Sequence, residues 1–205
     1  VDLSQFSDVL VKTAVNKAIE QSGVASGRVR LSFLDESTSP IWTLKCEQST
    51  RLSILCGDVR KASETVRLTQ SVHNINTTSP LAGIKSCNYL EPLMAFDEAK
   101  SRGFDEALRL NERGEVTSAC MANLFWIKGE QLFTPSLKTG CLAGTTREYI
   151  LENLEFDEVE AGIEAIREAD EIFLTSAGIG VVPVAVFDGR ELKNIGHPIT
   201  EILPF

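Results

Sequence analysis

The chain has 205 residues, of which 43% are hydrophobic and 24% charged, and this composition is typical of soluble globular proteins. The 29 acidic residues outnumber the 20 Lys and Arg, and the resulting net charge of −9 argues against nucleic acid or an anionic membrane surface as the main partner. No stretch approaches the roughly 18 consecutive apolar residues of a membrane span. Five cysteines without a CxxC pair and only two histidines predict free thiols in a reducing cytoplasm rather than a zinc site.

The first third of the chain predicts a small α/β domain. Apolar residues recur at helical spacing over residues 3–20, which indicates an amphipathic helix. Polar and apolar residues alternate in RVRLSFLD, WTLKC and RLSILC, so three strands of a small sheet are expected. The polar stretch HNINTTSP, residues 73–80, is typical of a linker. We therefore expect a first domain over residues 1–72.

Residues 80–205 predict a larger domain of mixed α/β class. Pro92 is compatible with the first of three expected helices, because the N–H groups of a first turn have no partner within the helix. The expected helices cover 88–100, 145–154 and 162–169. The expected strands lie within 106–111, 116–128, 131–135, 171–175 and 181–187.

Four segments of the second half carry a resemblance to a known family. They are GIKSCNYL (83–90), GEVTSACMANLFWIKG (114–129), TGCLAGTTREYIL (139–151) and EIFLTSAGIGVVPV (171–184). Their order and spacing resemble the class IV aminotransferases, which include branched-chain and D-amino acid aminotransferases and 4-amino-4-deoxychorismate lyase. The resemblance implies the class IV fold (α/β, or α+β), with an incomplete small α/β domain and a larger pseudo-barrel domain. It also implies the cofactor pyridoxal 5'-phosphate (PLP) and a cytoplasmic homodimer.

Lys85 matches the lysine that holds the cofactor in this family. An aldehyde cofactor reacts with an unprotonated amine, and the apolar neighbours Leu81, Ile84 and Leu90 are expected to favour that form by desolvation. The alternative is an ordinary surface lysine at a strand-to-helix junction. Tyr89 matches a tyrosine near the cofactor hydroxyl in some relatives, and its alternative is helix packing.

CLAGTTRE has the features of a phosphate-binding helix start. Gly144 allows close approach of the backbone, and the N–H groups of Thr145 and Thr146 open a helix whose positive end favours an anion. Thr145 followed three residues later by Glu148 also fits a capping box, so both interpretations remain open. In the family, the residues that match Leu142, Thr145 and Thr146 contact the ring or bind the phosphate.

LTSAGIGVVPV resembles the late strand and turn that close over the phosphate. Ser176 and Ala177 fall at that turn, and Gly178 and Gly180 allow a tight path. Relatives often have a threonine at the position of Ala177, so the contact here is expected from backbone N–H groups or from Ser176. The alternative is a glycine-rich hairpin entry.

Ser118 is the main departure from the family pattern. The family has at this position a glutamate that faces the pyridine nitrogen of the cofactor and keeps it protonated, so that the ring accepts electrons during transamination. A serine hydroxyl supplies no such charge. Glu115 lies three positions earlier, which on a strand points it to the opposite face. The alternative for Ser118 is neutral drift in a protein without aminotransferase activity.

The start of the chain is a second departure. Family members begin with additional strands, an aromatic segment and an arginine that binds the phosphate. Residues 1–72 resemble only the later part of that domain, so the N-terminal part is expected to be missing. Arg28 and Arg30 lie too late to replace that arginine, and His73 and His197 are expected to be structural.

The predicted function is that of a PLP-dependent enzyme closest to the aminodeoxychorismate lyases, because these share ANLFW followed by a basic, glycine-containing turn. Such an enzyme eliminates pyruvate from its substrate and leaves 4-aminobenzoate, a step of folate biosynthesis. One alternative is a branched-chain or D-amino acid aminotransferase. Across the two hypotheses, the expected substrate is an aminodeoxychorismate-type molecule or a small amino acid. The other alternative is a non-catalytic relative, which Ser118 and the missing N-terminal part favour, whereas Lys85 and GTTR favour an enzyme.

Overall fold

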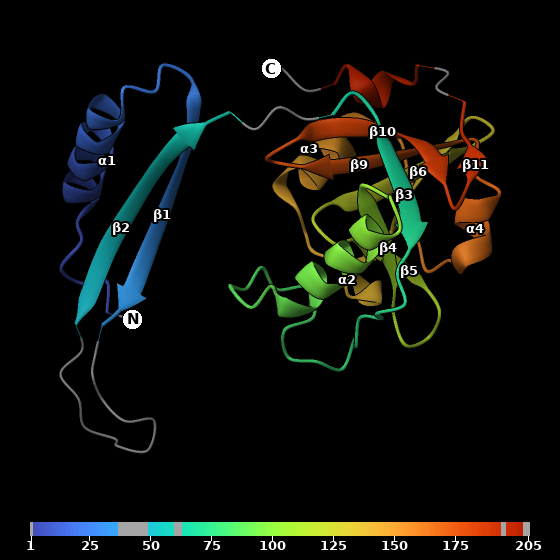
Figure 1. Cartoon of the computed structure of the whole chain (residues 1–205), viewed down its shortest axis with the longest axis horizontal. Coiled ribbons are helices and arrows are strands. Elements are labelled where there is room, and N and C mark those ends of the chain that lie inside the picture. Colours follow the sequence, from blue (N-terminus) through green and yellow to red (C-terminus); the bar gives the residue numbers. More distant parts are fainter. Residues whose placement is uncertain (1, 37–48, 60–62, 194–195, 203–205) are drawn as a thin grey trace. The chain divides into compact units, whose positions relative to one another are not determined.

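The computed structural model describes residues 2–36, 49–59, 63–193 and 196–202. The chain divides into two compact units, Val1–Lys61 and Ala62–Phe205, which are drawn in Figure 1.

The first unit is one helix and one hairpin of long strands. Its elements are α1 (Asp8–Ser22), β1 (Gly27–Asp35) and β2 (Thr50–Asp58). The helix begins after Ser7, whose side chain accepts a hydrogen bond from the N–H of Leu10, and ends at Gly23 in the left-handed region. The two strands pair antiparallel from Gly27 opposite Asp58 onward. The helix and two of the expected strands are confirmed, and the strand expected at 42–46 lies outside the described residues.

The second unit contains all the remaining elements. They are β3 (Val66–Gln70), α2 (Leu90–Ser101), β4 (Glu106–Leu110), β5 (Val116–Ala119), β6 (Asn123–Lys128), β7 (Gln131–Pro135), η1 (Leu137–Thr139), α3 (Thr145–Asn153), β8 (Asp157–Val159), α4 (Ile163–Arg167), β9 (Glu171–Ser176), β10 (Gly180–Phe187), β11 (Arg190–Glu191) and η2 (Pro198–Thr200). The helices and strands expected between residues 88 and 187 are present in that order.

The pairing of β3 shows that the boundary between the two units lies earlier in the chain than expected. β3 pairs in parallel with both β10 and β4, so residues 66–70 belong to the sheet of the second unit. The division between compact units therefore falls between Lys61 and Ala62, before the segment 73–80 that was expected as the linker. Residues 73–80 instead lie against the second unit, where the N–H of Ile75 donates to Leu110 O at 2.8 Å.

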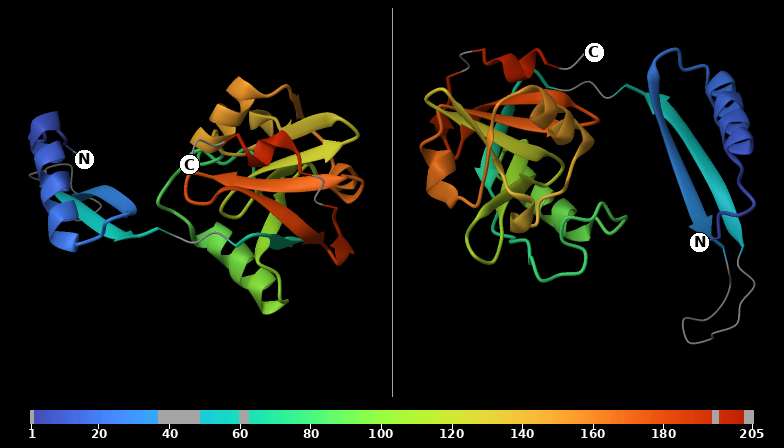
Figure 2. Two further views of the ribbon diagram at one scale, coloured as in Figure 1. Left: turned by 90° about the horizontal axis from the view of Figure 1, so that it is seen from above. Right: turned by 180° about the vertical axis from the view of Figure 1, so that it is seen from behind.

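The strands of the second unit form one sheet that bends back on itself. Their order is β5-β4-β3-β10-β9-β6-β7-β8, with β11 paired to β10. β5 begins this order and β6 lies near its other end, yet only residues 120–122 join the two strands. The sheet must therefore curl into a half-barrel, as the turned views in Figure 2 show, and this confirms the expected pseudo-barrel.

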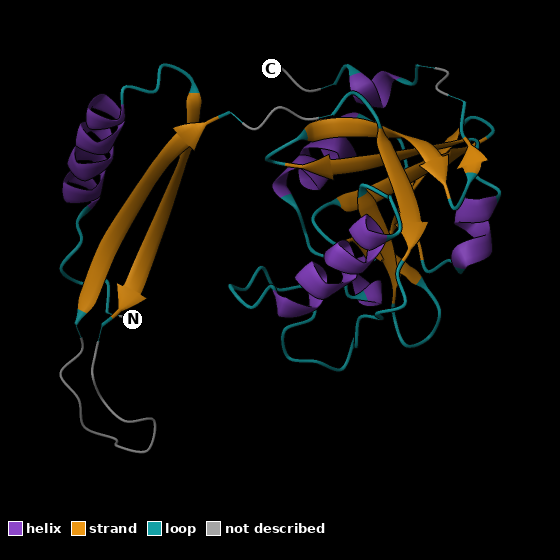
Figure 3. Cartoon of the chain, in the orientation of Figure 1, coloured by secondary structure: helices purple, strands orange, loops and turns teal. Residues whose placement is uncertain are grey.

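Both faces of the sheet are covered, which explains the uninterrupted apolar run in β6. Leu124 and Trp126 belong to one buried cluster, while the alternate residues Phe125 and Ile127 belong to another. α4 contributes to the first cluster, α3 and η2 contribute to the second, and α2 packs against β4 through small residues. Figure 3 shows these helices around the sheet.

Within the described part of the chain, no helix combines the length and apolar character needed to cross a membrane. The four cysteines there, Cys56, Cys87, Cys120 and Cys141, are free thiols.

Candidate functional site

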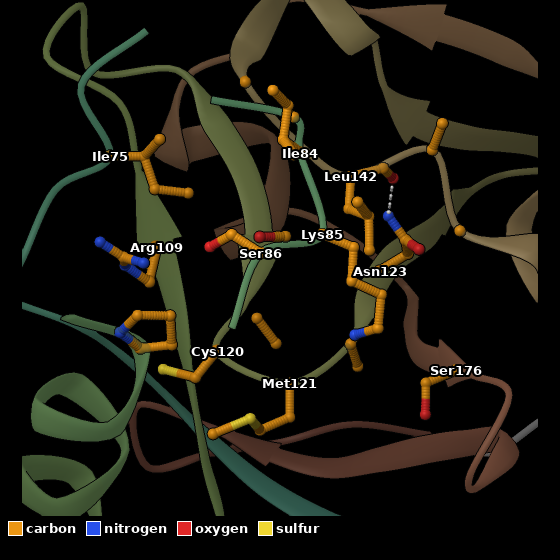
Figure 4. A pocket seen from close by; sticks show the side chains of 18 of the residues that line it. Ile75, Ile84, Lys85, Ser86, Arg109, Cys120, Met121, Asn123, Leu142 and Ser176 are labelled. Atoms are coloured by element: carbon orange, nitrogen blue, oxygen red, sulfur yellow. Dashed lines mark hydrogen bonds between the residues drawn. The ribbon is translucent and has the colours of Figure 1, made fainter. Parts of the chain in front are cut away.

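A cavity of about 490 Å³ opens in the second unit, and the four segments singled out in the sequence all contribute to its wall. The eight predicted site residues lie together in this wall: Lys85, Tyr89, Ser118, Leu142, Thr145, Thr146, Ser176 and Ala177. The structure therefore brings these eight residues together, and their roles stay a prediction. Figure 4 shows Lys85 reaching into the cavity, with Leu142, Asn123 and Ser176 on one side of it and Arg109 on the other.

Lys85 is held by the irregular segment that precedes α2. Gly83 has a φ of 70°, and its N–H donates to Gly140 O at 3.2 Å, which ties this segment to the loop before α3. The Lys85 Nζ donates to the Tyr89 hydroxyl at 2.5 Å, and Tyr89 is the N-cap residue of α2. The two predicted residues thus form a hydrogen-bonded pair inside the cavity.

The expected desolvation of Lys85 by its apolar neighbours is wrong. Leu81, Ile84 and Leu90 are 46%, 59% and 66% exposed, so they do not shield the amine. Leu81 and Ile84 border the cavity together with Lys85, but the irregular backbone of this segment leaves them partly exposed instead of packed as in a regular helix or strand. Lys85 itself is exposed to the cavity.

α3 begins at the cavity with three backbone N–H groups that have no partner. Gly144 is the N-cap residue and supplies no side-chain cap, so the capping box expected at Thr145 and Glu148 does not form. The N–H of Glu148 donates to Gly144 O, whereas the N–H groups of Thr145, Thr146 and Arg147 make no hydrogen bond within the described residues. Donors at a helix start, with the positive end of the helix dipole, are suited to an anion such as a phosphate.

Asn123 fixes the loop that leads into α3. Its Nδ2 donates to Leu142 O at 2.7 Å from the first position of β6. A Cβ at position 144 would collide with the Asn123 Oδ1, so a larger residue there would require the Asn123 side chain to move. Asn123 is not among the site residues predicted from the sequence. A contact between a strand and a loop far along the chain leaves no local pattern that would reveal it.

Polar side chains next to α3 add to the unsatisfied donors. Thr146 is only 8% exposed, and its hydroxyl makes no hydrogen bond within the described residues. Thr175, near the end of β9, is a fully buried residue of the cavity wall, and its Oγ1 has no hydrogen-bond partner among the described residues. Ser176 follows it, with an Oγ that accepts from the N–H of Gly178 at 3.4 Å. A buried hydroxyl without a partner is costly, which indicates that a bound ligand satisfies it.

Ser118 lies on β5 in the cavity wall, and its neighbour across the ladder is Arg109 of β4. Arg109 also lines the cavity and is 4% exposed. Glu115 is absent from the wall, because Arg113 and Asn111 bind its carboxylate at 2.6 Å and 2.7 Å. Glu115 therefore lies outside the cavity wall and does not stand in for the missing glutamate.

The turn between β5 and β6 is held by Glu106. Its buried carboxylate accepts hydrogen bonds from the N–H groups of Ala107, Cys120 and Met121 at 2.9–3.2 Å. Burial nevertheless raises the pKa of Glu106. Burial, with the adjacent Glu106, also raises the pKa of the Cys120 thiol to about 12, so this cavity residue stays a neutral thiol and is no nucleophile.

The two histidines lie outside the cavity wall. His197 is the N-cap of η2, where its Nδ1 accepts a hydrogen bond from Ile199 N at 3.2 Å, and this agrees with the structural role expected for it. Within the described ranges, no cluster of His, Cys, Asp and Glu is arranged to hold a metal ion.

Comparison with known proteins places this geometry in a family. Residues 3–187 match the family described as amino-transferase class IV. An aminodeoxychorismate lyase of Vibrio harveyi is 34% identical over 127 residues, which are 60% of this chain and 46% of that protein. A branched-chain-amino-acid aminotransferase of Escherichia coli (strain K12) is 32% identical over 120 residues, which are 56% of this chain and 39% of that protein. The chain thus spans less than half the length of either relative.

A solved structure shows the same fold. An aminotransferase from Brucella abortus, bound to the cofactor PLP, superposes with a TM-score of 0.81 at 23% identity. The superposition covers 97% of this chain and 74% of that one.

Proposed function

This chain belongs to the amino-transferase class IV family, and we propose that its cavity binds PLP and serves an elimination like that of aminodeoxychorismate lyase. The observation that carries the proposal is the convergence of Lys85 and the unpartnered donors of α3 on one cavity. An amine that can bond to an aldehyde and a set of donors for a phosphate are what the two reactive ends of PLP require.

The phosphate end is assigned to the start of α3 and the end of β9. The N–H groups of Thr145 and Thr146 face an anion, and the hydroxyls of Thr146, Thr175 and Ser176 border the same space. The N–H of Ala177 is a further donor at this end in the proposed binding mode. The orphaned Thr175 hydroxyl supports this assignment, because folding would otherwise leave a buried donor unused.

The ring is assigned to the space between Lys85 and β5. Lys85 would hold the cofactor covalently with Tyr89 beside it, and Leu142 would line the space for the ring. In this mode Ser118 faces the ring nitrogen. When bound, PLP supplies an electron-accepting ring that stabilises negative charge developing at the substrate α-carbon.

The proton transfer of the proposed reaction is assigned to residues of this chain. Once the substrate amine has replaced Lys85 on the cofactor, the freed Lys85 amine would be the base that removes the substrate α-proton, and its hydrogen bond to Tyr89 would orient it within the cavity. Loss of the leaving group as pyruvate then yields 4-aminobenzoate. An elimination passes the negative charge of the α-carbon to a leaving group, so it depends less on an electron-accepting ring than amino transfer does. Elimination is therefore compatible with Ser118, which supplies no charge to the ring nitrogen.

The binding proposal is tested by titrating the protein with PLP, recording the absorbance spectrum, and reducing the complex with borohydride. Peptide mass mapping should then find the label on Lys85, and Lys85→Ala should abolish it. Lys138→Ala is the matched control, because that side chain is 81% exposed and lies outside the cavity wall. A label on another lysine, or none at saturating PLP, would overturn the proposal.

A branched-chain or D-amino acid aminotransferase is the second candidate, and an E. coli relative named branched-chain-amino-acid aminotransferase, 32% identical over 120 residues, favours the branched-chain form. The two reactions have different products. Incubation with aminodeoxychorismate should release pyruvate and 4-aminobenzoate, whereas an aminotransferase moves an amino group to an added 2-oxo acid. Amino transfer without pyruvate release would favour the second candidate. The proposal includes a cytoplasmic homodimer, and sedimentation equilibrium of the purified protein tests its oligomeric state.

A further inference from the structure

Arg109 is an unusual residue for the wall of a cavity. It sits in β4, where every residue is buried, and its own side chain is 5% exposed. Its Cα partner in the neighbouring strand is Ser118, so both side chains leave the sheet on the same face and both border the cavity. A full positive charge is therefore buried beside a serine of this wall.

The partners of Arg109 leave its charge incompletely compensated. Nε donates to His73 O and Nη2 to Asn74 O, each at 3.2 Å, and both acceptors are neutral carbonyls. The single carboxylate in contact within the described residues is that of Glu91 in α2, at 3.4 Å from Nη2. The Glu91 side chain is 77% exposed, so solvent screens much of its charge. Nη1 makes no hydrogen bond within that same part of the chain.

The other titratable groups around this end of the cavity do not cancel the positive charge of Arg109. Lys85 and Tyr89 approach from the segment before α2, and the Cys120 thiol stays neutral. Glu106 of β4 is a buried carboxyl group, but the turn N–H groups bind it and it is not part of the cavity wall. The wall around Ser118 therefore presents a buried cation and hydroxyl donors, and its only carboxylate among the described residues is that of the exposed Glu91, which pairs with Arg109.

We propose that Arg109 and Ser118 keep the ring nitrogen of bound PLP unprotonated, Arg109 by its charge and Ser118 by donating a hydrogen bond to the nitrogen. Protonation would place a second positive charge near a buried guanidinium, and a nearby like charge disfavours the charged form of a base. A serine hydroxyl can donate to the lone pair of a neutral ring nitrogen. The inference rests on the proposed function, in which Ser118 faces that nitrogen.

The test measures the nitrogen directly rather than through activity. The full-length protein is loaded with PLP labelled with nitrogen-15 in the ring, and its NMR shift, which separates protonated from unprotonated pyridine, is followed against pH. The variants are Arg109→Gln, which keeps a donor for the carbonyls but removes the charge, and Arg109→Lys, which keeps the charge. Ser118→Glu/Arg109→Gln introduces the opposite charge in place of both groups.

The wild type and Arg109→Lys are expected to hold an unprotonated nitrogen near neutral pH. The protonation midpoint should rise by about one pH unit or more in Arg109→Gln, and further in the double variant, the scale on which one nearby charge shifts a titration. A protonated nitrogen in the wild type would overturn the inference, and so would equal midpoints in the wild type and the double variant. If Arg109→Gln fails to fold, the wild type, Arg109→Lys and Ser118→Glu still decide the question.

Failure of the proposed function gives a different result. If the protein takes up no PLP, or if borohydride labels no lysine of the cavity, the binding proposal falls and the inference about Arg109 falls with it. If PLP binds and labels Lys85 but its ring nitrogen is protonated, only the inference about Arg109 is overturned.

Discussion

Thr146 combines a buried side chain with an unused hydroxyl at the start of a helix, and this makes its contribution to ligand binding measurable. Thr146→Ala should weaken PLP binding by about 1–2 kcal/mol, the scale of a hydrogen bond to a charged group, or roughly 5- to 30-fold in Kd. Thr146→Ser keeps the hydroxyl and serves as the control. Fluorescence titration checks the prediction, and equal affinities for the wild type and Thr146→Ala would limit the site to its backbone donors.

Thr175 allows a sharper test, because its effects on stability and on binding should have opposite signs. Its buried hydroxyl has no partner within the described residues, so Thr175→Val removes an unsatisfied group while nearly keeping the shape. The unfolding free energy of the ligand-free protein should rise by about 1 kcal/mol, whereas PLP affinity should fall. Urea denaturation and PLP titration measure the two quantities. A variant that is less stable and binds PLP unchanged would show that the hydroxyl has a structural role.

Residue by residue, the sequence predicts the members of the site better than their surroundings. The eight predicted residues share one cavity because their segments keep the order and spacing of a known family. Asn123, Thr175 and Arg109 are missing from that prediction. Asn123 matters through a contact with a loop far along the chain, and Arg109 through a cross-strand neighbour. Such contacts depend on strand register, which no local pattern in a single sequence determines.

At the scale of elements, the sequence predicts the helices and longer strands from periodicity and misses elements that depend on tertiary pairing. β3 is only Val66–Gln70 and mixes apolar with polar residues, so its place between β10 and β4 leaves no distinct pattern. At α3, by contrast, the sequence contains a local motif for a capping box, but the corresponding hydrogen bonds do not form in the structure. The helix starts one residue earlier than the motif requires, because Gly144 and not Thr145 is its N-cap.

The short helix η2 should carry part of the pH dependence of stability. Burial lowers the pKa of His197 below its usual 6.5, and the neutral Nδ1 accepts the capping hydrogen bond from Ile199. The unfolded chain therefore binds the proton at higher pH than the folded chain does. The unfolding free energy should be unaffected above about pH 7.5 and should fall as pH decreases from 6.5 through the folded-state pKa.

His197→Asn keeps an acceptor for the cap and removes the titration, so its stability should fall less on acidification than that of the wild type. His73→Asn replaces the other histidine and serves as the control for a His-to-Asn exchange. Urea midpoints at about pH 8 and about pH 5 for the three proteins give the comparison. Parallel pH profiles for the wild type and His197→Asn would contradict the assignment.

At the scale of the whole molecule, the two units differ in how much apolar surface they bury. The sequence predicts two parts, but it does not determine where the boundary between them lies. The polar segment 73–80 has the composition of a linker, and only the pairing of β3 with β10 and β4 shows that the second unit begins before this segment. None of the described residues of the first unit is buried, whereas the second unit contains three buried clusters. Stability should therefore come mainly from the second unit.

A matched pair of leucines tests this difference. Leu174 in β9 is 1% exposed and lies between Leu124 of β6 and Val182 of β10, so Leu174→Ala should lower the unfolding free energy by about 2–5 kcal/mol. Leu55 in β2 is 62% exposed, and Leu55→Ala should change the unfolding free energy by less than about 0.5 kcal/mol. Urea denaturation followed by circular dichroism measures both, and hydrogen exchange should show faster opening of β1 and β2 than of β6 and β9. A large loss in Leu55→Ala would mean that a partner surface covers the first unit in solution, because an exposed side chain has no burial to lose.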